Sequence, residues 1–355
     1  MEVSFPRLGI SLTLDRVAFS VFGVAIYWYA LIIGVGYSLA VLYGFLCRRR
    51  FGVTKNDLLD LIIVGTVFGV IGARLYYVIF SGVRYNSLLD VINMRDGGVA
   101  IYGTVIGAGV SALIACRVKK VSFSALGDVM CVGFFIGQAI GRWGNFINQE
   151  AFGGATSLPW GMQSANTLAV VPDSPVHPCF LYESLWCAAG FVLLHVLSKK
   201  YYKFRGQLLI SYALWYGLGR VWIEALRTDS LYLIPGVVKV SQLLALLSFA
   251  LIPFLWRGLK GKSLININIT VNEKRRLRIF VPNVPVTDIP DDEWTALDNV
   301  PEKPIKDDLA DAWEKLSGWG KGVAKKASDV VSSLTKKNPG KYEKKPLENP
   351  EKKEQ

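Results

Sequence analysis

The sequence predicts an all-α integral membrane protein with seven transmembrane helices and a charged C-terminal extension. Of its 355 residues, 52% are hydrophobic. The hydrophobic residues cluster before about residue 257, in runs that approach the ~20 residues a helix needs to cross a bilayer. Lysine and arginine gather instead in alternate connections between these runs. This alternation is typical of a polytopic protein whose basic loops face the cytoplasm.

Seven candidate spans follow one another along the chain: 22–47, 57–80, 98–116, 124–143, 179–197, 206–226 and 236–256. Basic clusters follow the first, third, fifth and seventh of them, namely RRR at 48–50, RVKK at 117–120, KKYYKFR at 199–205 and WRGLKGK at 256–262. The positive-inside rule therefore places the N-terminus outside and the C-terminus in the cytoplasm. We expect a membrane domain over residues 1–258 and a cytoplasmic tail over residues 259–355.

The composition argues against several other classes of protein. The net charge of +12 is explained by loops that face an anionic inner leaflet, and we expect no nucleic-acid partner. The five cysteines form no CxxC pair and only two histidines are present, so we expect no disulfide framework, metal site or cofactor. The first twenty residues lack a basic leader and a cleavage site, so the first span is expected to act as the insertion signal.

Polar side chains interrupt six of the seven spans at one level, which the predicted orientation places in the outer leaflet. On the sixth span, Tyr216, Arg220, Glu224 and Arg227 recur at helical spacing and share one face. The other members of the set are Tyr29, Arg74, Tyr102, Arg142, Asn145, His177 and Glu183. Because ionised groups are costly at membrane depth, such residues are normally paired or line a wet cavity.

Two interpretations of these charges remain open. Arg220 and Glu224 lie one turn apart, and mutual neutralisation explains that pair without a ligand. The whole set favours a ligand, because its arginines outnumber the acids Glu183 and Glu224, even with Glu150 nearby. Since the planar guanidinium suits phosphate, the surplus predicts binding of a phospholipid headgroup.

The stretch GRWGNFINQEAFGG at 141–154 resembles the G-R-x-G-N-F-x-N-x-E-x-x-G signature of bacterial phosphatidylglycerol–prolipoprotein diacylglyceryl transferases. Further stretches occur in the order and spacing of that family: YWYALIIGVG, GARLYYVI, DGGVAIYGTVIGA, HPCFLYESLW and YGLGRVWIEALRTD. The resemblance covers roughly residues 20 to 257 and leaves the tail outside.

This resemblance implies a reaction and its substrates. Members of the family transfer the sn-1,2-diacylglyceryl group of phosphatidylglycerol to the lipobox cysteine thiol of a preprolipoprotein, forming a thioether and releasing glycerol phosphate. The expected partners are therefore phosphatidylglycerol, a signal peptide with a lipobox cysteine, and the lipid bilayer. The expected location is the bacterial cytoplasmic (inner) membrane, with the active site toward the outer leaflet.

The resemblance also implies roles for individual residues. Arg142 and Arg220 would bind the lipid phosphate, and Arg74 and Arg227 would complete the cationic, substrate-binding set. The remaining assignments are Asn145 and Asn148 as ligands of headgroup hydroxyls, Gly144 and Gly153 as points of close backbone approach, Glu150 and Glu224 as partners that hold the arginines, and Tyr29 and Tyr216 as walls of the headgroup pocket.

Tyr102 is a departure from many members of the family, which carry at this position a histidine cast as the base for the thiol. A phenol is a poor base at neutral pH. We therefore expect Tyr102 to be a hydrogen-bonding wall residue, with the arginines promoting the thiolate. His177 is explained equally by catalysis and by the start of a helix before Pro178.

The tail and a rival function leave further alternatives. Residues 264–271 alternate like a strand and suggest a hairpin, residues 307–334 have helical spacing, and the end resembles a disordered segment. The helical part is explained equally by a helix on the inner leaflet and by a solvated linker. The rival function is a transporter or receptor for a phosphorylated anionic solute, which predicts a midplane site and internal repeats. The polar set lies at one face, and we find no convincing repeat.

Overall fold

The computed structural model describes residues 1–83, 85, 87–93, 97–119, 121–230, 232–234 and 238–261. The predicted hairpin at 264–271, the predicted helix at 307–334 and the predicted disordered end lie outside these described residues. The expected division at residue 258 likewise stays a prediction.

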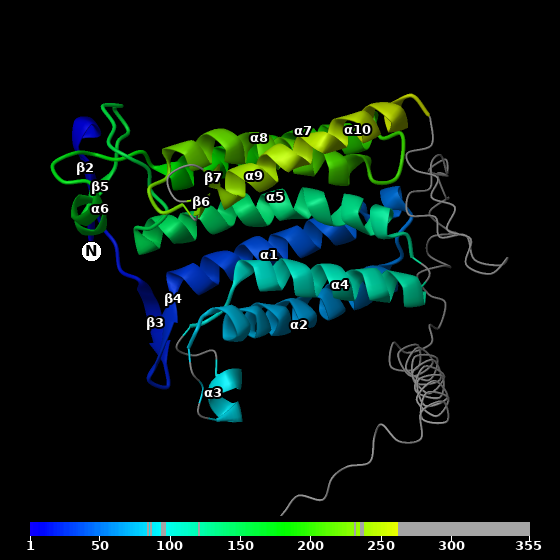
Figure 1. The fold of residues 1–355 in the computed structure, drawn as a ribbon, viewed down its shortest axis with the longest axis horizontal. Coiled ribbons are helices and arrows are strands. Elements are labelled where there is room, and N and C mark those ends of the chain that lie inside the picture. Colours follow the sequence, from blue (N-terminus) through cyan, green and yellow to red (C-terminus); the bar gives the residue numbers. More distant parts are fainter. Residues whose placement is uncertain are drawn as a thin grey trace, which may run out of the picture. The chain divides into compact units, whose positions relative to one another are not determined.

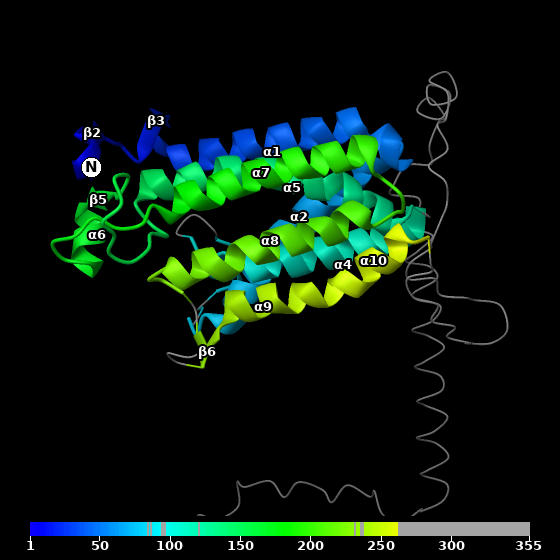
Figure 2. The ribbon, with the colours of Figure 1, turned by 90° about the horizontal axis from the view of Figure 1, so that it is seen from above.

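Long helices lie side by side and make up most of the described chain (Figures 1 and 2). The α-helices are α1 (Trp28–Cys47), α2 (Lys55–Phe80), α3 (Leu88–Ile92), α4 (Ile101–Lys119), α5 (Phe123–Asn148), α6 (Ala165–Val170), α7 (Cys179–Lys200), α8 (Gln207–Leu226), α9 (Val240–Ser248) and α10 (Ile252–Leu259). Three 3₁₀ turns are η1 (Pro6–Leu8), η2 (Arg48–Phe51) and η3 (Phe249–Leu251).

Six stretches of the described chain are long and apolar enough to cross a membrane: Trp28–Phe51, α2, α4, α5, α7 and Val240–Leu259. Large apolar side chains on these helices are exposed, for example Ile79 (61%), Val105 (64%) and Leu185 (61%). Exposure of so much apolar surface to water is unfavourable, whereas its exposure to lipid is not. The chain is therefore a multi-pass membrane protein, and α8 is a further helix of 20 residues within it.

Each predicted span overlaps an observed helix, and the seventh is divided into α9, η3 and α10. The two largest differences are at the start of the first span and the end of the fourth. The first span was expected to begin at residue 22, whereas α1 begins at Trp28 because the preceding apolar residues form a hairpin. The fourth was expected to end at residue 143, whereas α5 continues to Asn148. The polar motif that follows Arg142 is therefore helical as far as Asn148.

Within the described residues, short strands form three small antiparallel sheets, which the all-α prediction missed. The strands are β1 (Glu2–Phe5), β2 (Ile10–Thr13), β3 (Val17–Val21), β4 (Val24–Tyr27), β5 (Gln163–Ser164), β6 (Tyr232–Ile234) and β7 (Val238–Lys239). Their orders are β2-β1-β5, β3-β4 and β6-β7. In the first sheet Val3 is opposite Leu12 on one side and Ser164 on the other.

The first sheet and α6 lie beyond the end of α5, at the same end of the molecule as the start of α7 and the end of α8 (Figure 1). A buried apolar cluster joins them to the helices and contains Val3, Phe146, Phe152, Met162, Val176 and Phe180. Phe146 belongs to α5 and Phe180 to α7, so this cluster fixes the ends of the two helices that carry the polar motifs.

Helix α5 is the central helix, because it packs against α1, α7 and α8. Its residues Val132 and Phe135 are fully buried, together with Leu194 of α7 and Leu208 of α8. Helix α2 pairs chiefly with α4, and α8 also packs against α9. The helices α5, α7 and α8 thus form one packed group, which carries most of the predicted site.

Candidate functional site

Four charged side chains from α5, α7 and α8 form an alternating series of cations and anions, which we call the charge ladder. Its members are Arg142, Glu183, Arg220 and Glu224. Glu183 Oε1 lies 2.5 Å from Arg142 Nη2 and 3.3 Å from Arg220 Nη1, and Arg220 Nη2 pairs with Glu224 Oε2. Both carboxylate side chains are only 3% exposed. The ladder therefore holds two guanidinium groups side by side through a shared carboxylate.

A buried aspartate at the opposite end of the helices joins α5 to the start of α8, and both arginines lie at the same distance along their helices from this junction. Asp128 of α5 accepts hydrogen bonds from Gly206 N (2.5 Å) and Leu209 N (2.9 Å) at the start of α8. It thereby serves as the N-terminal cap that Gly206 cannot provide. Arg142 lies fourteen residues after Asp128 and Arg220 fourteen residues after Gly206. At 1.5 Å per residue, both arginines lie about 21 Å from this junction and hence at a similar depth.

The end of α5 folds back so that Glu150 reaches the asparagines of the motif. Gln149 has φ +54°, and the hydrogen bonds Glu150 N to Asn145 O (3.0 Å) and Gln149 N to Phe146 O (3.1 Å) close a Schellman turn. Glu150 Oε1 then accepts from Asn145 Nδ2 (2.8 Å) and from Asn148 Nδ2 (3.4 Å).

Asn145 connects this turn to the charge ladder. Its Oδ1 accepts a hydrogen bond of 3.3 Å from Arg142 Nη1, while its Nδ2 donates to Glu150. Glu150 was expected to hold an arginine. In the structure it orients the two asparagines, and Glu183 is the carboxylate that bridges the arginines.

The two motif glycines lie where other groups approach closely. A Cβ on Gly144 would lie 2.6 Å from the ring of Tyr29, which places this tyrosine of α1 against the α5 motif. A Cβ on Gly153 would lie 2.8 Å from His177 Cβ and 2.9 Å from Leu226 O. Gly153 also donates from its N–H to His177 O at 2.9 Å. The motif is thereby packed between the start of α1, the segment before α7 and the end of α8.

Tyr216 lies one turn before Arg220 on α8, and its ring is stacked on that of Tyr212 at 5.8 Å with an interplanar angle of 2°. Tyr212 accepts a hydrogen bond of 2.7 Å from Gln138 Nε2 of α5. Tyr216 thus lies on the face of α8 that packs against α5, one turn from the charge ladder.

Arg227 is the C-terminal cap of α8 and forms a bidentate pair with Asp229, at 2.9 and 2.8 Å. Burial would lower the pKa of Arg227, but the Asp229 carboxylate more than offsets this and raises it. The expected surplus of arginine is reduced accordingly, because the sequence analysis did not count Asp229. Gly153 is bridged to the backbone of Arg227, so this cap lies beside the second motif glycine.

Arg74 and Tyr102 lie on the α2–α4 pair, apart from the charge ladder. The Arg74 guanidinium donates to four backbone carbonyls: Asp90 (2.8 Å), Val91 (2.7 Å), Gly97 (3.2 Å) and Gly98 (2.8 Å). Gly98 has φ +80°, and a Cβ there would overlap Arg74 Nη1, so only glycine fits. Arg74 thus joins α2 to α3 and to the glycine pair that precedes α4. Tyr102 is half-buried, with its ring 6.3 Å from that of Tyr76.

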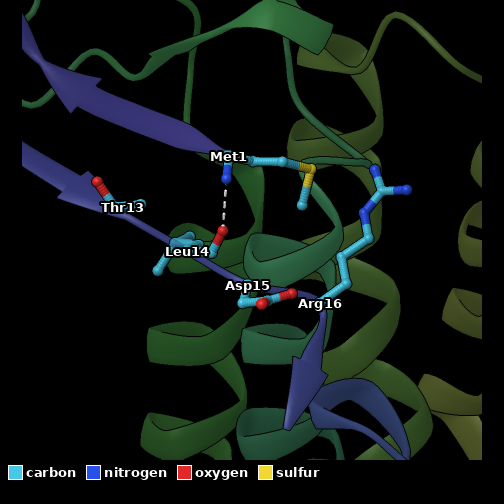
Figure 3. Close-up of a pocket in the computed structure, with 5 residues that line it drawn as sticks. All are labelled: Met1, Thr13, Leu14, Asp15 and Arg16. Carbon is cyan, nitrogen blue, oxygen red and sulfur yellow. Dashed lines mark hydrogen bonds between the residues drawn. The ribbon is translucent and has the colours of Figure 1, made fainter. Parts of the chain in front are cut away.

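Two cations near the motif were missed by the sequence analysis. Lys239 Nζ donates to Glu224 O (2.6 Å) and Arg227 O (3.1 Å) at the end of α8. Arg16 Nη2 donates to Asn148 O (3.1 Å). Arg16 also lines an open pocket of about 370 Å³ with Met1, Thr13, Leu14 and Asp15 (Figure 3). Neither residue belongs to a motif, so the surrounding sequence did not indicate that it lies near the site.

His177 lies in the segment before α7, and burial lowers its pKa from the ordinary value of 6.5. Its Nδ1 is 3.2 Å from the hydroxyl of Tyr182, which also accepts a hydrogen bond of 2.9 Å from Trp160 Nε1. Within the described part of the chain, no three His, Cys, Asp or Glu side chains are grouped so that they could hold a metal ion.

Comparison with known proteins gives one consistent result. The model of the prolipoprotein diacylglyceryl transferase family matches residues 16–257. The phosphatidylglycerol–prolipoprotein diacylglyceryl transferase of Clostridioides difficile (strain 630) is 40% identical over 235 residues, which are 66% of this chain and 91% of the relative. The corresponding protein 1 of Clostridium perfringens (strain 13 / Type A) is 38% identical over 264 residues, 72% of this chain and 100% of the relative.

Proposed function

Because the chain belongs to the prolipoprotein diacylglyceryl transferase family, we propose that it transfers the sn-1,2-diacylglyceryl group of phosphatidylglycerol to the lipobox cysteine of preprolipoproteins. This is the first step of bacterial lipoprotein maturation. The sulfur of the cysteine attacks the glyceryl carbon bonded to the phosphate oxygen. A C–S bond forms, the C–O bond breaks, and glycerol phosphate leaves with the electron pair. The thiol proton is released.

The observation that carries this proposal is the charge ladder, with Arg142 and Arg220 held together by Glu183 at 2.5 and 3.3 Å. Each guanidinium has five N–H donors, so contacts with the carboxylates leave donors for a phosphate. The lipid phosphate carries one negative charge and gains a second as the C–O bond breaks. Two preorganised cations therefore stabilise the transition state more than the bound lipid, which is the requirement for catalysis.

The carboxylates prevent the arginines from reorganising during the reaction. Glu183 and Glu224 are almost fully buried, so their attraction for the guanidinium groups is only weakly screened. The N–H donors of Arg142 and Arg220 that the carboxylates leave unused would also favour the thiolate form of the substrate cysteine. We therefore assign ionisation of the thiol mainly to the arginines, with Tyr102 as a hydrogen-bonding residue of the wall.

The asparagine turn is the proposed binding site for the headgroup glycerol. Asn145 uses one amide donor on Glu150 and accepts from Arg142, so a second N–H and a second lone pair remain for a hydroxyl. Asn148 is oriented by the same carboxylate. Tyr29 borders this region at Gly144, and we propose that Tyr216 forms a further wall of the headgroup pocket. We propose that Arg74 and Arg227 act on substrate binding indirectly, because their donors hold α3 against α2 and fix the end of α8.

We propose seven spans, with α8 as the sixth in chain order, an N-terminus outside and a C-terminus in the cytoplasm of a bacterial inner membrane. Support comes from the basic residues at the ends of helices opposite to the charge ladder, among them Arg48, Arg49 and Arg50 after α1, Arg117 and Lys119 in α4, and Lys199 and Lys200 in α7. This arrangement puts the ladder at the outer leaflet, where translocated lipobox peptides meet phosphatidylglycerol.

The proposal is tested with phosphatidylglycerol labelled in its acyl chains and a lipobox peptide, mixed with the purified protein in lipid vesicles. We expect label on the peptide cysteine, and none on a matched peptide with serine in its place. Uptake of a phosphorylated solute into the vesicles without thioether formation would instead identify the rival transporter.

A further inference from the structure

Two tryptophans join α7 and α8 through a pair of reciprocal hydrogen bonds. Trp186 Nε1 donates to Trp215 O at 2.9 Å, and Trp215 Nε1 donates to Trp186 O at 3.0 Å. The two indole rings are stacked, with centroids 4.5 Å apart and planes at 16°. Each indole N–H of one helix is therefore satisfied by the backbone of the other. We call this arrangement the tryptophan clamp.

Each tryptophan is followed four residues later by a glycine that receives the opposite indole. A Cβ on Gly190 would lie 2.7 Å from Trp215 Nε1, and a Cβ on Gly219 would overlap the indole of Trp186. The same W-x-x-x-G spacing thus occurs on both helices, in WCAAG and WYGLG. The glycines allow the rings to lie flat against the opposite backbone, where a side chain would push them away.

The clamp and the charge ladder share one register between the antiparallel helices. Along α7 the order is Glu183, Trp186, Gly190, and the residues opposite them along α8 run backward as Arg220, Gly219, Trp215. Arg220 is thus the residue next to the glycine that holds Trp186. Sliding one helix by a single residue would move these groups by about 1.5 Å. The Glu183–Arg220 contact of 3.3 Å would then be lost.

We propose that the tryptophan clamp is a positioning device for the transfer reaction, in which Trp186 and Trp215 fix the register that places Glu183 between Arg142 and Arg220. This inference rests on the proposed function. The tryptophans touch no reacting atom and act through Glu183. Helices in lipid lack a hydrophobic driving force for association, so hydrogen bonds and close packing must set their register. The indole N–H groups supply such bonds about one turn from the catalytic charges.

A positioning role predicts a specific kinetic result. Substituting phenylalanine for either tryptophan keeps an apolar ring and removes one N–H. We expect Trp186→Phe to lower kcat about fivefold to tenfold, with KM for phosphatidylglycerol changed less than about twofold. Because the two bonds are reciprocal, Trp215→Phe and the double variant should show nearly the same loss as the first substitution.

The experiment measures transfer of labelled diacylglyceryl to a lipobox peptide by the full-length protein, on the monodisperse fraction of each variant. Near-ultraviolet circular dichroism reports the stacked indoles, and either single variant should lose the signal that depends on their stacking. The matched control is Trp256→Phe, because Trp256 is 61% exposed on α10 and its ring contacts Lys260. This control should keep the wild-type kcat.

Several results would overturn the proposal. One is a kcat within twofold of wild type in the folded double variant, and another is a loss of kcat no larger than that of the control. A third is a double variant whose loss of kcat equals the product of the two single losses. If a phenylalanine variant does not fold, benzothienylalanine at position 186 keeps the ring shape and removes the N–H, and it should give the same loss of kcat. Failure of the wild-type protein to transfer label would refute the proposed function, whereas a clamp variant with wild-type kcat refutes only the clamp.

Discussion

Glu183 offers the sharpest test of the charge ladder, because one carboxylate contacts both arginines. Glu183→Gln keeps the shape of the side chain and removes its charge. The amide oxygen can still accept from one guanidinium, but the amide NH₂ then faces the other. Since Glu183 is only 3% exposed and lies 2.5 Å from Arg142, the change breaks a buried ion pair, which typically costs about 3–5 kcal/mol. Part of this cost lowers the free energy of unfolding. The remainder is reduced because the two arginines move away from their wild-type positions.

We expect Glu183→Gln to lower kcat roughly a hundredfold, equivalent to about 2.7 kcal/mol of transition-state stabilisation. The KM for phosphatidylglycerol should not rise, because the two cations remain available to the ground-state phosphate. Transfer of labelled diacylglyceryl to a lipobox peptide measures both parameters. Glu183→Asp is the matched control, and it should recover part of the rate because the charge is kept. A folded Glu183→Gln variant with kcat within a few-fold of wild type would refute the bridging role.

Arg142→Ala and Arg220→Ala should each lose most turnover at unchanged membrane abundance, and lysine at either position should restore it only in part, because a point charge cannot reproduce the fork; near-normal activity of both alanine variants contradicts phosphate binding. Tyr102→Phe should slow transfer only about fivefold, the effect of one lost hydrogen bond; a loss beyond about a hundredfold with selective rescue at alkaline pH would identify Tyr102 as the base. A chain of residues 1–262 should keep catalysis, since every motif residue precedes its end; a stable but inactive truncation means that the membrane domain extends further. His177 has a pKa lowered from 6.5 by burial, so its contribution to stability is full above 6.5 and is lost as the pH falls through the folded pKa; His177→Gln should flatten thermal stability between about pH 7 and pH 5, and an unchanged slope rejects this assignment.

The helical spans and the family were predictable from the sequence, because lipid imposes a simple requirement. A helix that crosses a bilayer needs a long apolar run, and the distribution of basic residues in the loops predicts its orientation. The motif around Arg142 is long and specific, and the family assignment made from it is confirmed by the match over residues 16–257. The hairpin β3–β4 was missed because its apolar residues continue directly into α1, so the two elements form one run.

The partners of the charged residues were not predictable, because they depend on which helices pack together. Glu150 and Glu224 were expected to hold the arginines, and only the packing of α5 against α7 and α8 shows that Glu183 bridges Arg142 and Arg220. Arg74 was grouped with the other arginines by its predicted depth. Its partners are backbone carbonyls of α3 and of Gly97 and Gly98, and the sequence pattern does not predict such contacts.

Identification of the products tests the central claim most directly. The wild-type protein is incubated with phosphatidylglycerol and a lipobox peptide, and mass spectrometry follows both the peptide and the released headgroup. We expect the peptide to gain one diacylglyceryl group on its cysteine sulfur, with one glycerol phosphate released for each modified peptide and no modification of a serine peptide. Peptide modified without equimolar glycerol phosphate, or no thioether at all in the presence of folded protein, would contradict diacylglyceryl transfer through the charge ladder.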